Sequence, residues 1–166
     1  MPGTGQAAGA GPVTAYRVEV EQGLAVDAAA FAAEVEQTLA HPSGWAPAEG
    51  VALQRADGPA AAFTVTLASA ATTDRLCAPL TTEGKFSCFN GQRAVLNADR
   101  WRDGAATYGA DLAAYRQYLV NHEVGHALGN RHARCPAPGA PAPVMVQQSV
   151  GLDGCAPNPW PGTTGG

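Results

Sequence analysis

The chain has 166 residues, a length that fits one domain, and its 46% hydrophobic content is sufficient for an ordinary buried core. The formal net charge of −4 provides no basic surface for nucleic acid or for an anionic membrane. No stretch of the sequence reaches the roughly 20 apolar residues of a membrane span. We therefore expect a globular monomer with no nucleic-acid partner and no membrane span in this chain.

The two ends of the chain differ in composition from the rest. Residues 1–12 are rich in Gly and Ala and contain neither a charged start nor an apolar run of the length typical of a signal peptide. We expect this segment and residues 162–166 to be flexible, with a single domain over residues 13–161.

The first predicted elements are a strand and a helix. Between Tyr16 and Glu21 apolar residues alternate with charged ones, which is typical of a strand with one buried face. Asp27 is a suitable N-cap for a helix whose apolar residues recur every four positions: Phe31, Val35 and Leu39. The dipeptide His41-Pro42 ends this helix, and we expect His41 to be a surface residue and not a ligand.

Four further strands are predicted. Residues 51–54 and 63–68 contain alternating apolar residues that can face a core. Residues 86–89 and 93–97 flank Asn90-Gly91, and this dipeptide is the strongest short-range hairpin signal. We expect these last two strands to be antiparallel neighbours.

The longest predicted helix begins after Asp111, which can cap it, and runs to Leu128. Its side chains step by four, three and four residues along one face: Tyr115, Leu119, His122 and His126. Seven prolines follow His132, so little regular structure is expected after it.

The segment His122-Glu-Val-Gly-His-Ala-Leu-Gly-Asn-Arg-His132 contains three of the four histidines of the chain. His122 and His126 project from the same face of a helix, close enough to share one ion. Glu123 is turned roughly 100° around the helix, beside the site but not as a ligand. Gly129 can adopt the left-handed conformation that ends a helix, so that His132 returns to the metal. Three imidazoles complete the protein ligands of a catalytic Zn²⁺, which keeps a fourth position open.

This pattern is similar to the zinc motif of metzincin proteases, and Gly125 and Leu128-Gly129 resemble its matrixin version. The resemblance implies an α+β fold: a mixed twisted sheet, two helices with the zinc at the foot of the second, and a short irregular C-terminal subdomain. In metzincins a methionine in a tight turn forms an apolar base under the zinc. Met145 is similar to this Met-turn residue, the alternative being a core methionine that fills a gap. The separation from His132 is short for the family, and Gln147 stands where some members have a metal-contacting tyrosine.

Three other segments resemble a family of small secreted bacterial domains of unknown function. They are Tyr115–His126, Pro143–Gln148 and Asn158–Pro161. The likeness extends from about Tyr16 to Pro161 and bears on fold and compartment more than on substrate.

The four cysteines predict two disulfide bonds. We expect Cys77–Cys88 and Cys135–Cys155, since each pairing closes a local loop across a turn or a proline-rich segment. The alternative is four buried free thiols in a cytosolic protein. Disulfides indicate an oxidising compartment, so we expect a secreted or extracellular protein, at the cell surface if an N-terminal anchor precedes this chain.

The combined features predict a secreted zinc endopeptidase that acts on peptide or protein substrates. Three imidazoles on Zn²⁺ lower the pKa of a bound water toward about 7, and Glu123 takes its proton and passes it to the departing amine. Tyr108 and Arg131 are candidates to stabilise the oxyanion. The first alternative is a zinc hydrolase of cell-wall peptide amides, and the second is a catalytically silent zinc-containing peptide-binding module, against which the presence of Glu123 argues.

The resemblance also implies where substrate binds. In metzincins the strand that corresponds to residues 86–89 is the exposed sheet edge above the zinc cleft. We expect its backbone groups to pair with an extended peptide; the residues concerned are Phe86, Ser87, Cys88 and Phe89. Residues 143–148 are expected to form one wall of a pocket.

Overall fold

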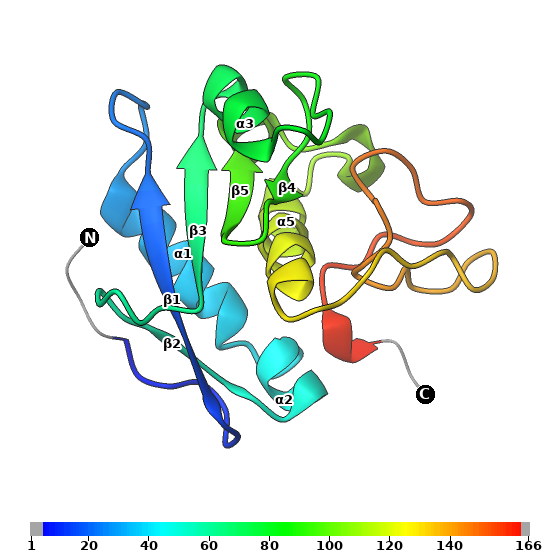
Figure 1. Cartoon of the computed structure of the whole chain (residues 1–166). Helices are drawn as coiled ribbons and strands as arrows, with labels where there is room; N and C mark the ends of the chain where they lie inside the picture. Colours follow the sequence, from blue (N-terminus) through cyan, green and yellow to red (C-terminus); the bar gives the residue numbers. More distant parts are fainter. Residues whose placement is uncertain (1–4, 164–166) are drawn as a thin grey trace.

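The computed structural model describes residues 5–163 and has a five-stranded sheet at its centre, in the order β2-β1-β3-β5-β4 (Figure 1). The strands are β1 (Val13–Val20), β2 (Ala52–Arg55), β3 (Phe63–Ala68), β4 (Cys88–Phe89) and β5 (Arg93–Asn97). The first four strands in this order are parallel, and β4 is antiparallel to β5. This mixed sheet confirms the predicted α+β class.

Two long helices pack against each other and against the sheet. They are α1 (Ala28–Leu39) and α5 (Leu112–Ala127). The side chain of Asp27 accepts hydrogen bonds at the start of α1, and that of Asp111 accepts one from Ala114 N at the start of α5. Both predicted N-caps are therefore confirmed.

Three short helices were not predicted from the sequence: α2 (Trp45–Glu49), α3 (Ala70–Cys77) and α4 (Ala98–Asp103). Each has eight residues or fewer, which is too short for helical periodicity to show in a window of 11 to about 18 residues. Side-chain caps mark two of them, because Ser69 accepts from Thr72 N and Asn97 accepts from Asp99 N. Two 3₁₀ turns, Ala106–Tyr108 and Pro161–Thr163, complete the elements.

The hairpin at Asn90-Gly91 is confirmed. Asn90 N donates to Arg93 O, and the side chain of Asn90 accepts from the backbone of Gln92 and Arg93. The strand before the turn is shorter than expected, because β4 begins at Cys88 and not at Phe86. Ser87 lies outside the strand and uses its Oγ to accept from Asn97 N.

The segment at residues 5–12, for which flexibility was expected, lies along β2. Gly5 N donates to Arg55 O, and Ala8 forms an isolated bridge with Leu53. Residues 1–4 and 164–166 lie outside the described residues.

After α5 the chain contains no strand or α-helix within the described range, as the prolines predicted. This C-terminal segment, residues 133–163, packs beside α5 (Figure 1). No helix between residues 5 and 163 has both the length and the apolar character needed to cross a membrane.

Candidate metal centre

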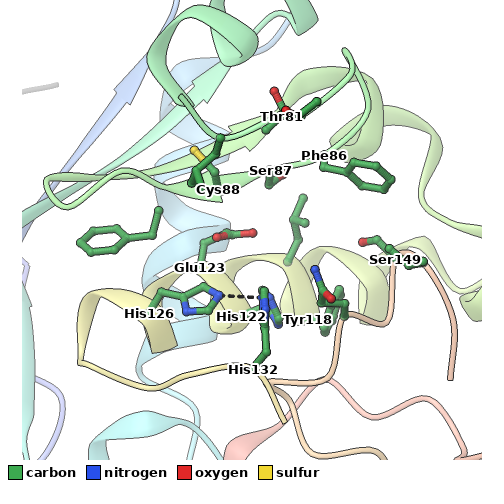
Figure 2. Close-up of a pocket in the computed structure, with 16 residues that line it drawn as sticks. Thr81, Phe86, Ser87, Cys88, Tyr118, His122, Glu123, His126, His132 and Ser149 are labelled. Carbon is green, nitrogen blue, oxygen red and sulfur yellow. Dashed lines mark hydrogen bonds between the residues drawn. The ribbon is translucent and has the colours of Figure 1, made fainter. Parts of the chain in front are cut away.

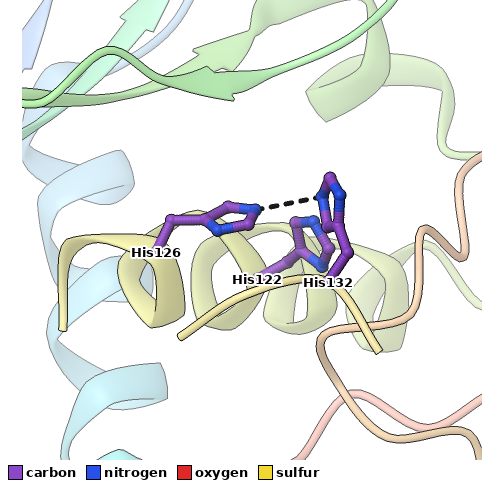
Figure 3. A group of neighbouring side chains, drawn as sticks. All are labelled: His122, His126 and His132. Atoms are coloured by element: carbon purple, nitrogen blue, oxygen red, sulfur yellow. Dashed lines mark hydrogen bonds between the residues drawn. The ribbon is translucent and has the colours of Figure 1, made fainter. Parts of the chain in front are cut away.

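Three imidazoles converge at the end of α5. His122 and His126 lie one turn apart on this helix, and Gly129 with φ of 97° ends it, as expected, so that His132 folds back (Figure 3). One ring nitrogen from each lies within 4.8 Å of the others. The Nε2 atoms of His126 and His132 are 3.1 Å apart.

Backbone carbonyls orient two of these rings. His122 Nδ1 lies 2.9 Å from Val144 O, and His126 Nδ1 lies 2.8 Å from Asn130 O. A carbonyl oxygen can only accept, so Nδ1 carries the proton in both rings and Nε2 keeps its lone pair. A hydrogen bond from the other ring nitrogen to a backbone carbonyl is typical of metal-binding histidines.

Burial favours the neutral form of His122 and His132. It lowers the pKa of His122 to about 3. Burial and then the neighbouring imidazole of His126 lower the pKa of His132. Neutral imidazole nitrogens suit first-row transition metals such as zinc, copper, iron and nickel, so the three residues fit a metal ion of this group.

Met145 lies against α5 at the position of Gly125. A Cβ atom on Gly125 would lie 2.6 Å from Cζ2 of Trp45 and closer still to the sulfur of Met145. Ala133 N donates to Met145 O at 2.9 Å, which ties the segment after His132 to the same turn. Met145 is 5% exposed, and the turn around it therefore supports both His122, through Val144 O, and His132.

Glu123 is buried in the wall of the same cavity. Its side chain is 4% exposed, and its Oε2 has no hydrogen-bond partner among the described residues. Burial raises the pKa of the Glu123 carboxyl to about 8. A buried acceptor without a partner is costly, and carboxyls shifted in this way are typical of functional sites.

The cavity has a volume of about 510 Å³ and is lined by residues of β4 and α5. Figure 2 shows Phe86, Ser87 and Cys88 along its upper wall and Glu123 with the histidines along its lower wall. All four residues predicted to form the substrate edge line it. Because Asn90 N bonds Arg93 O and Cys88 pairs with Val95, alternation along the strand turns the backbone groups of Phe89 away from β5.

Several site contacts are not visible in the sequence. Trp45 Nε1 donates to Asn121 O at 2.8 Å, and Asn130 Nδ2 donates to Glu49 Oε1 at 2.5 Å. These bonds tie α2 to the second half of α5 and to the turn that follows it. They join residues about 80 positions apart, and no local sequence signal could have identified them.

Neither candidate for stabilising an oxyanion lines the cavity. Tyr108 is buried and donates to Gln148 Oε1 at 2.8 Å, and Arg131 is exposed. Tyr118 does line the cavity, but its hydroxyl donates to Val146 O and accepts from Gln148 N. His41, which was expected at the surface, is half-buried, stacks on Trp160 and lies outside the group of three clustered histidines.

Both predicted disulfides are confirmed. Cys77–Cys88 joins the end of α3 to β4, with Cα atoms 6.1 Å apart. Cys135–Cys155 closes the proline-rich part of the C-terminal segment, with Cα atoms 5.7 Å apart. The first holds the upper wall of the cavity, and the second restrains the segment that supports His132.

Fold and site together define a small, disulfide-linked α+β protein with a three-histidine candidate metal centre. The chain belongs to the family described as "Protein of unknown function (DUF3152)", whose model matches residues 1–161. This description assigns no activity. Comparisons with curated proteins and with solved structures give no match.

Proposed function

We propose that this protein is a secreted zinc endopeptidase. The observation that carries the proposal is the convergence of three imidazoles and the buried Glu123 carboxyl in one cavity beneath a sheet edge. The similarity of the His122–His132 motif to that of metzincins favours zinc over the other metals that imidazoles bind. The two disulfides support secretion, because such bonds persist in oxidising compartments.

In this proposal the histidines bind the metal and Glu123 transfers a proton. His122, His126 and His132 would hold the zinc, which when bound lowers the pKa of a water and polarises a carbonyl. Glu123 takes a proton from the attacking water and passes it to the departing amine nitrogen, so that its own charge is restored. The Glu123 carboxyl acts as a base only when it is ionised. The positive charge of a metal ion bound beside it would favour the ionised form.

The substrate in this proposal is an extended peptide that pairs with the edge at β4. The outward backbone groups of Phe89, together with those of Ser87 just before the strand, would provide the pairing. Hydrogen exchange with a bound peptide hydroxamate should therefore show protection at the Ser87 and Phe89 amides. The Cys88 amide, which already faces β5, should change little.

The decisive experiment measures zinc content and peptide hydrolysis in the wild-type protein and in Glu123→Gln. We expect one zinc per chain in both proteins. Hydrolysis in the variant should fall about 10²–10⁴-fold, as is typical when a general acid–base group is lost. Glu34→Gln is a suitable control, because it alters only a partly exposed ion pair with Arg116.

Each failure has a distinct meaning. Zinc-loaded wild-type protein that hydrolyses cell-wall peptide amides but not proteins would favour the amide hydrolase. Zinc binding with no hydrolysis of either class would favour a peptide-binding module. Less than about half an equivalent of zinc, not raised by titration, would refute the metal centre itself.

A further inference from the structure

Two strongly exposed apolar side chains lie at the candidate metal centre. Among the described residues, three large hydrophobic side chains are highly exposed: Val13 at 58%, Leu80 at 55% and Val150 at 67%. Leu80 and Val150 both line the cavity that contains Glu123, whereas Val13 does not. Single exposed hydrophobic residues need no explanation, but a group of them around a cavity is typical of a binding surface.

Leu80 and Val150 line the cavity from two segments that are far apart in the chain. Leu80 follows α3, and its neighbour Thr81 lies in the upper wall (Figure 2). Val150 belongs to the C-terminal segment, and its neighbour Ser149 lies in the lower wall. In Figure 2 the ring of Phe86 and Ser149 lie at the end of the cavity away from His126. Phe86 and the residue that precedes Val150 therefore lie to one side of the histidines.

Both walls are anchored by hydrogen bonds. Leu80 N donates to Cys77 O at 2.9 Å, and the carboxylate of Asp74 accepts from Thr82 Oγ1 at 2.5 Å and from Gly84 N at 2.8 Å. On the other wall, Val150 N donates to Gln147 O at 2.9 Å. The backbone that carries the two exposed side chains is thus held in place before any ligand arrives, which reduces the ordering cost of binding.

The charge of the cavity restricts what can bind. Apart from Glu123 and the three histidines, the residues lining it within the described chain include no Asp, Glu, Lys or Arg. A charged substrate side chain at this end would find no partner after losing its hydration. An apolar side chain would instead bury its own surface together with that of Leu80, Val150 and Phe86.

We propose that Leu80 and Val150, together with the ring of Phe86, form a subsite that binds an apolar side chain of the peptide substrate on one side of the cleaved bond. This inference rests on the proposed peptidase function for its choice of ligand. It makes the enzyme selective for peptides with a large aliphatic or aromatic residue at that position.

The test uses zinc-loaded protein and matched peptide hydroxamates, whose hydroxamate group binds the metal without being hydrolysed. Each pair differs only in a leucine or serine side chain, and two series place the hydroxamate at the N-terminal or C-terminal end, so that both sides of the metal centre are sampled. Affinity is measured for the wild type, Leu80→Ser, Val150→Ser and the double variant. Val13→Ser is the control, because Val13 is equally exposed but lies outside the cavity.

In one series we expect the leucine compound to bind about 10-fold more tightly than the serine compound, a difference typical of filling an apolar pocket. The double variant should reduce this ratio to about 2-fold, each single variant should give an intermediate ratio, and Val13→Ser should leave it unchanged. Thermal unfolding of each variant verifies that it is folded. Equal binding of the two compounds in both series, or no binding of either, would overturn the subsite, as would an unchanged ratio in the folded double variant.

Hydrolysis of an unbiased peptide library separates the two proposals. Selective hydroxamate binding without hydrolysis of any peptide would refute the endopeptidase and leave the apolar subsite standing. Hydrolysis without preference for apolar residues, unaltered in the double variant, would refute the subsite and leave the endopeptidase standing.

Discussion

Residues 13–128 and the C-terminal segment each supply part of the candidate metal centre, but their interiors differ in composition. The first region has an apolar core in which β3 is buried along its whole length. The C-terminal segment has little regular structure, and its buried centre includes the side-chain amides of Gln148 and Asn158, which are 0% and 5% exposed.

Side-chain amides replace a backbone ladder in the C-terminal segment. Gln148 Oε1 accepts from Tyr108 OH and from Asn158 N, while Gln148 Nε2 donates to Asn158 O. Asn158 Nδ2 donates to Ala142 O and to Trp160 O. A proline-rich chain lacks many backbone donors, so these amides satisfy carbonyl groups that would otherwise be buried without partners. Gln148 Nε2 also lies within 3.4 Å of Pro143 O, one residue before Val144, whose carbonyl orients His122.

The largest effect on stability is expected from Gln148→Ala. The substitution leaves the buried Tyr108 hydroxyl and two backbone groups of Asn158 without partners, at a combined cost of about 3–5 kcal/mol in unfolding free energy. Gln147→Ala is a matched control because Gln147 is exposed, and it should change stability by less than about 0.5 kcal/mol. Urea unfolding of both variants tests the comparison, and equal costs would show that the amide network is not what stabilises the segment.

Removal of each disulfide in turn should show a different effect on zinc binding in the two regions. Replacing either pair with serine should cost about 3 kcal/mol through the loops of 11 and 20 residues that the bridges close. Loss of Cys135–Cys155 should also weaken zinc binding, since it loosens the segment behind His132. Loss of Cys77–Cys88 should leave zinc affinity unchanged, and a competitive chelator titration of both variants measures the contrast.

Gly125→Ala tests the contact between the two regions. In an unobstructed helix this change stabilises a protein by about 1 kcal/mol. Here the new methyl group would collide with Met145 and Trp45, so we expect a destabilisation of about 1–3 kcal/mol instead. A Met145→Ala background removes one of the collisions, and in it the substitution should cost less. A stabilising effect of Gly125→Ala in the wild-type background would contradict the observed packing.

The smallest expected effect is a pH dependence confined to the first region. The Glu21 carboxylate accepts from Ser69 N and from Thr72 Oγ1, and these bonds lower its pKa. The pKa in the folded protein then lies below the unfolded value of about 4.3. The stabilisation is present above that pH and is lost as the pH falls through the folded pKa. Glu21→Gln should reduce the slope of unfolding free energy against pH below about 4.3, whereas Gln148→Ala should not, because amides do not titrate.

Local patterns in the sequence predicted the elements that carry the site. Asp27 and Asp111 cap their own helices, Asn90-Gly91 forms its own turn, and His122 and His126 share a face through helical geometry alone. Each of these features depends on residues a few positions apart. The disulfides were also predicted, because each cysteine pairs with its nearest neighbour in the sequence.

Contacts between distant segments decided the rest. Gln147 and Gln148 are adjacent and chemically identical, yet one lines the cavity and the other is buried in the amide network. The neighbours that orient His122 and support Gly125 come from Val144, Met145 and Trp45, on segments brought together only by folding. Leu80 and Val150 likewise face one cavity although 70 positions separate them in the chain. Sequence determines the candidate ligands and the helix that carries two of them, because backbone geometry is local, while burial and the shape of the cavity depend on how whole segments pack.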